Sequence, residues 1–154
     1  MEKSNYNFVS KNRRPVENRR FVTGHGNFVA DIDRPNMLHV AILACHEPSA
    51  VIDEIDFSAA LKMRGVVDVI IGKELAEATK PLLNGLDTPH IKRYPLAFEQ
   101  VRYAGEWVCA IVAKSRAIAE DASEKVLLKT TSLKFVLDSE EAILSKSPIV
   151  HKKH

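Results

Sequence analysis

Aromatic residues and net charge are both scarce in this sequence. Phenylalanine, tyrosine and tryptophan make up 6% of its 154 residues, and the formal net charge is only +2. Proteins that bind nucleic acids normally carry a clustered basic face, often with aromatic side chains that stack on bases. The composition therefore gives no indication of a nucleic-acid partner.

Cysteines and long apolar runs are scarce as well. Cys45 and Cys109 lie in apolar surroundings and share no CxxC spacing, which favours buried free thiols. No apolar run approaches the roughly 20 residues of a membrane-spanning helix, and the N-terminus lacks the apolar core of a secretory signal. We therefore expect a cytoplasmic protein that does not enter a membrane.

Recognisable catalytic and cofactor-binding motifs are missing too. Gly24-His25-Gly26 lacks the third glycine of a dinucleotide-binding loop, and the β-like Asn27-Phe28-Val29 follows it, so we interpret it as a tight turn. The six histidines show none of the short spacings that are typical of metal sites. No GxSxG nucleophile motif is present. We expect no catalytic, cofactor-binding or metal-binding residue in this chain.

Positive charge collects at the N-terminus, where residues 1–20 hold six cations and two anions. This arm either docks on an acidic or phosphate-bearing partner or is a solvated terminus, which is common in proteins. The arginines that would bind a partner are Arg13, Arg14, Arg19 and Arg20. The predicted organisation is a basic arm at 1–20, one domain at 21–150 and a polar tail at 151–154.

The body of the chain alternates between strand-like and helix-like patterns, which predicts an α+β fold with mixed sheet segments and packed helices. Strands are predicted at 37–45, 50–56, 66–71, 100–103, 106–113 and 133–137, and short β segments at 21–32. Helices are predicted at 57–64, 73–79, 115–128 and 139–144. We expect 37–45, 66–71 and 107–113 to share a sheet.

The segment from Lys80 to Phe98 contains three prolines and no sustained periodicity, which predicts a long surface loop. Seven large apolar residues lie in it: Leu82, Leu83, Leu86, Ile91, Tyr94, Leu96 and Phe98. Two interpretations remain open. Either these side chains form an interface with a partner, as exposed apolar patches usually do, or the loop folds back and fills the core of its own domain.

Five segments resemble, in order, the N-terminal part of the molybdenum-hydroxylase large subunit, the family of xanthine dehydrogenase, aldehyde oxidase and aerobic carbon monoxide dehydrogenase. Residues 19–32 (RRFVTGHGNFVADI) are similar to a family run of the type R-x-V/L-T-G-x-G-x-Y/F-V-x-D-I. Residues 101–110 (VRYAGEWVCA) resemble V-R-Y-V-G-E-P-V-A. The other three segments are 35–39 (PNMLH), 55–66 and 115–122 (SRAIAEDA).

The chain departs from the family pattern at three places. Asn36 stands where the family usually has glycine, and Trp107 stands where it has proline. Residues 44–48 read ACHEP, where the family often has R-S-P-H-A. The resemblance implies an α/β-hammerhead fold despite these departures.

The resemblance also implies a function. In this family, the molybdopterin-contacting loops, the substrate pocket and the catalytic glutamate lie in the larger region after the hammerhead domain. We therefore expect a structural, partner-binding domain or split subunit of a hydroxylase that acts on an aldehyde, a purine or other N-heterocycle, or carbon monoxide. It would bind the remaining molybdopterin-binding part of the large subunit, with iron–sulfur clusters and FAD elsewhere in the complex and no cofactor in this chain. The alternative is a free-standing small module that reuses the fold to bind a ligand or a protein.

Overall fold

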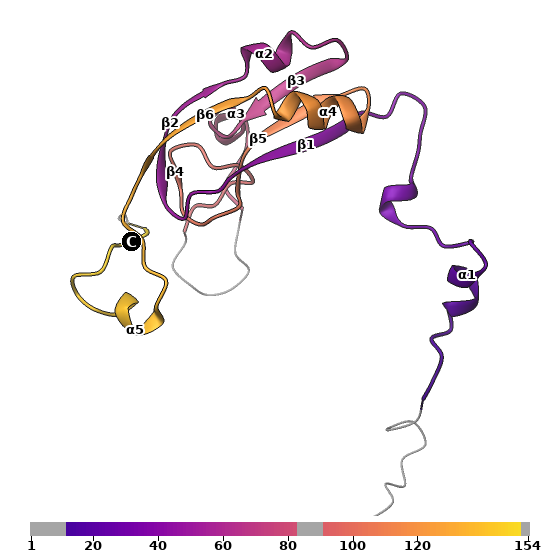
Figure 1. Ribbon diagram of the computed structural model, residues 1–154, viewed down its shortest axis with the longest axis horizontal. Coiled ribbons are helices and arrows are strands. Elements are labelled where there is room, and N and C mark those ends of the chain that lie inside the picture. Colours follow the sequence, from indigo (N-terminus) through magenta and orange to yellow (C-terminus); the bar gives the residue numbers. More distant parts are fainter. Residues whose placement is uncertain (1–11, 83–90, 152–154) are drawn as a thin grey trace, which may run out of the picture. The chain divides into compact units, whose positions relative to one another are not determined.

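The computed structural model describes residues 12–82 and 91–151, and the chain separates into two units, Met1–Pro35 and Asn36–His154. The described part of the first unit contains helix α1 (Asn18–Val22) and the short 3₁₀ helix η1 (Val29–Asp31) (Figure 1). The β segments expected at 21–32 are therefore wrong. Local contacts hold this unit instead, since the Phe21 and Phe28 rings stack with centroids 5.5 Å apart and the Phe28 amide donates to the Asp31 carboxylate.

In its described residues, the second unit contains two antiparallel sheets of three strands each (Figure 1). The first sheet has the order β1-β5-β3, formed by β1 (His39–Cys45), β5 (Glu106–Ala113) and β3 (Val66–Ile71). The most continuously apolar run, β5, lies in the centre, where both of its edges are paired. Ile111 pairs with Ala41 on one side and with Val69 on the other. The expectation that these three segments share a sheet is confirmed.

The second sheet has the order β4-β2-β6, formed by β4 (Gln100–Val101), β2 (Ala50–Asp56) and β6 (Leu127–Ser132). The strand expected at 133–137 is wrong, because its place is taken by the residues just before it. The ladder with β2 ends where Ser132 pairs with Ala50 and the Leu133 amide donates to the Ser49 carbonyl oxygen at 2.8 Å. Leu128 of β6 packs against the core, whereas Leu137 is almost fully exposed.

Within residues 36–82 and 91–151, four short helices accompany the sheets: α2 (Ser58–Leu61), α3 (Gly72–Ala78), α4 (Arg116–Ser123) and α5 (Ser139–Ala142). The Ser115 hydroxyl accepts a hydrogen bond from the Ile118 amide at 3.3 Å and caps α4. The predicted helices at 57–64 and 115–128 are shorter in the structure. Val126, which continues the apolar i+4 pattern of α4, is buried in the core but lies in the turn before β6.

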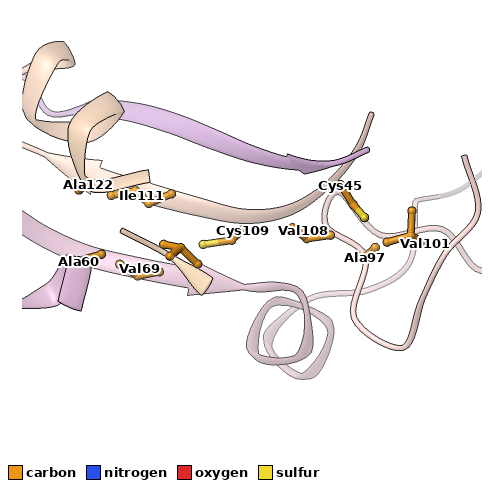
Figure 2. Packing of buried hydrophobic residues seen from close by; sticks show 10 residues of the cluster. Cys45, Ala60, Val69, Ala97, Val101, Val108, Cys109, Ile111 and Ala122 are labelled. Atoms are coloured by element: carbon orange, nitrogen blue, oxygen red, sulfur yellow. The ribbon is translucent and has the colours of Figure 1, made fainter. Parts of the chain in front are cut away.

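The core lies against one face of the first sheet, where two of these helices and residues of the second sheet pack together. Ala60 of α2 and Ala122 of α4 pack with Val69, Cys109 and Ile111 of the sheet (Figure 2). All five are almost inaccessible to solvent. Because alanine carries only a methyl group, both helices can approach the sheet closely.

Asn36 begins the second unit with a left-handed backbone, at a φ of 61°. Asparagine tolerates this conformation far better than a β-branched residue does, which explains how it can replace the glycine of the family pattern. We expect Asn36→Val to lower the free energy of unfolding by about 1–2 kcal/mol, and the matched Asn36→Gly variant to be at least as stable as the parent. Urea unfolding monitored by circular dichroism tests this, and equal stability of the two variants would contradict the assigned conformation.

Candidate partner-binding surfaces

The described residues contain no candidate metal centre. Within 12–82 and 91–151, no group of three or more histidine, cysteine, aspartate or glutamate side chains converges to hold a metal ion. None of the helices in these ranges is long and apolar enough to cross a membrane.

Both cysteines are free and buried. Burial raises the pKa of the Cys109 thiol to about 11 from its ordinary 9.0. The thiolate is the nucleophilic form of cysteine, so this thiol is poorly suited to catalysis. Cys109 instead serves as a small apolar residue of the core.

The raised pKa of Cys109 makes stability depend on pH. Below about pH 9 the thiol is protonated in both the folded and the unfolded chain, so its burial does not change the free energy of unfolding with pH. Between about pH 9 and 11 the unfolded chain releases this proton more readily, so we expect the free energy of unfolding to fall by about 2 kcal/mol. Urea titrations at pH 8 and pH 10.5 measure the difference. The Cys109→Ala variant should lack this part of the fall, and an identical fall in the variant would contradict the assignment.

The candidate arginines Arg13, Arg14, Arg19 and Arg20 all lie in the first unit and are exposed. Arg20 forms an ion pair of 3.2 Å with Glu17 and lies over the Phe21 ring. Large apolar side chains of this unit are exposed as well, namely Val16, Phe21, Val22, Phe28, Val29 and Ile32. No residue in its described part is buried. The described part of this unit therefore has exposed apolar side chains and no buried core.

The apolar residues of the 80–98 segment have different environments. Leu82 is 58% exposed, whereas Leu96 is 4% exposed and lies in the interior of its own domain. Ile91, Tyr94 and Phe98 are half-buried, and Leu83 and Leu86 lie outside the described residues. The expectation that Leu96 belongs to an interface is therefore wrong, because its side chain is buried in its own domain. The rest of that set stays a prediction.

The fold-back at Leu96 has a clear physical basis in the neighbouring Ala97. Its amide donates to the Trp107 carbonyl oxygen of β5 at 2.7 Å. An added Cβ on Gly72 would meet the Ala97 carbonyl oxygen at 2.1 Å, so the two backbones lie in direct contact. This end of the loop is therefore fixed against β5 and the start of α3.

Two further apolar surfaces were missed by sequence reasoning. The first is the segment after β6, where Phe135, Leu137, Ile143, Leu144, Ile149 and Val150 are exposed. The alternation at 133–137 marks apolar residues correctly but cannot show which face of the chain is covered.

The second missed surface is one face of the first sheet. Side chains alternate along a strand, and Leu43 faces the core, so Val40, Ile42 and Ala44 face the other way. Ile42 pairs with Ala110, and Ala44 pairs with Trp107. We call the face formed by Val40, Ile42, Ala44, Trp107, Ala110 and Val112 the outer face. Val40 is 56% exposed and Trp107 is 54% exposed.

Comparison with known proteins identifies this architecture. The family model described as "Aldehyde oxidase and xanthine dehydrogenase, a/b hammerhead domain" matches residues 23–134. The chain belongs to this family. The hammerhead fold expected from the motifs is thereby confirmed.

Relatives of this hammerhead domain are much longer proteins. The chain is 34% identical over 137 residues to the 6-hydroxypseudooxynicotine dehydrogenase complex subunit gamma of Paenarthrobacter nicotinovorans, covering 84% of this chain and 17% of the relative. It is 33% identical over 139 residues to the carbon monoxide dehydrogenase large chain of Hydrogenophaga pseudoflava, covering 88% of this chain and 17% of that protein. The crystal structure of quinoline 2-oxidoreductase from Pseudomonas putida 86 superposes with a TM-score of 0.78 at 32% identity, covering 86% of this chain and 17% of that one. The chain thus matches a partial domain of molybdenum-hydroxylase large subunits.

The described residues of the hammerhead domain do not fit a cofactor site. Cofactor pockets place a few polar groups at fixed positions inside a largely apolar cavity. Ser49 is the only buried polar or charged residue in the described ranges, and its hydroxyl contacts Gln100. The exposed apolar side chains described above remain as candidate binding features of the described residues.

Proposed function

We propose that this chain is a structural, partner-binding domain or separately encoded piece of a molybdenum-hydroxylase large subunit, without a complete active site of its own. The observation that carries the proposal is the exposed apolar surface of its two terminal segments. Burying one large aliphatic side chain contributes roughly 1.5–3 kcal/mol, and exposed apolar side chains that cluster usually mark interfaces. This chain matches only 17% of the length of its relatives. In a large subunit of that length, most of the protein would be available to cover these two segments.

The proposal extends to the whole complex. The remaining part of the large subunit would hold molybdopterin. This cofactor would supply the chemistry that oxidises an aldehyde, an N-heterocycle or carbon monoxide, with water as the source of the oxygen atom. Electrons would then pass to iron–sulfur clusters and FAD elsewhere in the complex. The names of the relatives support this range of substrates, since they include a carbon monoxide dehydrogenase and a quinoline oxidoreductase. This chain would bind the rest of the subunit and stabilise its structure.

The alternative of a free-standing binding module has less support. Such a module would be expected to cover its own apolar surface, because an isolated protein that leaves large patches exposed tends to associate. In contrast, the first unit and the segment after β6 leave large apolar side chains exposed.

The test compares the purified chain alone with the chain produced together with the remaining molybdopterin-binding part of the large subunit from the same organism. We expect the chain alone to contain no stoichiometric molybdenum and to reduce no dye with aldehydes or N-heterocycles. We expect the combined preparation to contain molybdenum and to turn over substrate. Stoichiometric molybdenum or clear turnover in the chain alone would overturn the proposal.

A further inference from the structure

Sheet edges in this domain differ in how they are protected against pairing with another strand. Natural proteins protect exposed edges with short strands, charged side chains or bulges. The edge strand β4 has two residues. The edge strand β6 carries Lys129, which is paired with Glu54 of β2 at 2.6 Å. The edge strand β3 carries Asp68, and its pairing with β5 is interrupted by a bulge at Val67.

The fourth edge, β1, has none of these devices. Its seven residues, HVAILAC, include no charged residue and no proline. The irregularity in its pairing comes from an extra residue on the partner strand, Val108 of β5, while β1 itself stays regular. In an edge strand, alternate residues direct their backbone N–H and C=O groups away from the sheet. Among the described residues, the backbone of His39 to Ala44 bonds to no strand or loop other than β5.

A groove follows this open edge. Its lining comes from residues 39–42 of β1 and from Arg116, Glu120 and Ser123 of α4, the helix that lies along β1 in Figure 1. Arg116 and Glu120 neutralise each other through an ion pair of 2.8 Å. The groove therefore presents no net charge from these two residues. Val40 and Ile42 contribute to the groove lining and also belong to the apolar outer face.

We propose that β1 accepts an extended segment of the remaining large subunit as an additional strand of the first sheet. Strand addition of this kind takes its affinity from main-chain hydrogen bonds and its specificity from alternate side chains. The neutral groove and the apolar outer face select a segment that is uncharged next to α4 and apolar beside Val40 and Ile42. The rest of a large subunit is the occupant that the comparisons support, because this chain spans only 17% of the length of its relatives. This inference rests on the proposed function.

Hydrogen–deuterium exchange of the free chain and of its complex with the remaining large-subunit part tests strand addition directly. Pairing would protect alternate β1 amides, those not bonded to β5, and we expect their exchange to slow at least about tenfold. Amides of β3 at the opposite edge should not change. If the complex forms without this alternate protection in β1, strand addition is wrong while the proposed function stands. If no complex forms, the proposed function and this inference both fail.

A matched pair of variants gives a second, independent measurement. Lysine on an edge strand opposes pairing, because its charge would have to leave water. We expect Val40→Lys to raise the Kd of the complex at least about tenfold and Val67→Lys to change it by less than about twofold. Val67 is 50% exposed and lies on the opposite edge strand, so both variants should fold. Equal effects of the two lysines would overturn the proposal, and so would a dimer of this chain alone with protected β1 amides.

Discussion

Replacing Gly72 by alanine is expected to lower the free energy of unfolding by about 3 kcal/mol. A Cβ at this position would lie 2.1 Å from the Ala97 carbonyl oxygen and 2.6 Å from the Ala97 carbonyl carbon. Both atoms belong to the backbone, so no side-chain rotation can relieve the overlap. Ala97 is also held by its hydrogen bond to Trp107. The chain would have to move the 96–97 segment or the start of α3.

Gly105→Ala is the matched control for this change. Gly105 has a φ of +89°, and an added Cβ there meets nothing within 4 Å. Alanine should therefore cost only the left-handed conformation, about 1 kcal/mol. Urea unfolding of both variants measures the difference. If Gly72→Ala is no more destabilising than Gly105→Ala, the loop does not fold back onto α3 as described.

Ile111→Ala is expected to lower the free energy of unfolding by about 4 kcal/mol, within the range measured for large-to-small changes in protein cores. Ile111 lies on the central strand β5 and is fully buried. Truncation would leave a cavity between the sheet and the two helices that cover it. Ile143→Ala is the control of identical chemistry, since Ile143 is 84% exposed and should cost less than about 0.5 kcal/mol. Similar losses in the two variants would show that β5 is not the centre of the core.

The first sheet could be predicted from the sequence because its strands carry strong local signals. Trp107 to Ala113 is a continuous apolar run, and Val66 to Ile71 is rich in β-branched residues, so both are predicted as strands without knowledge of their partners. The end of the helix predicted at 57–64 was placed less well. Asp56 accepts a hydrogen bond from the Ser58 amide at its start, but α2 ends at Leu61, and Gly65, with a φ of +97°, lies beyond that end.

The errors arose where structure depends on distant partners. Leu133, Phe135 and Leu137 alternate as a strand should, yet the ladder to β2 is formed by residues 127–132. That choice is made by the pairing of Ser132 with Ala50, which is remote in sequence. Phe21 to Ile32 has β-like residues, but the described part of the first unit has no second strand to pair with.

The candidate surfaces were predictable only in part for the same reason. Apolar composition drew attention to the 80–98 segment, but composition cannot separate Leu82, which is exposed, from Leu96, which is buried. The outer face of the first sheet was missed because its residues read simply as strand residues. Only the register shows that Ala44 and Trp107 lie opposite each other on one face.

The molar mass of the complex formed with the remaining molybdopterin-binding part of the large subunit tests the central claim most directly. Both components should first be shown to be folded by circular dichroism and then mixed or produced together. Size-exclusion chromatography with light scattering should give one species with one copy of this 17.2 kDa chain for each copy of its partner. Two folded components that elute separately at micromolar concentration would contradict the account.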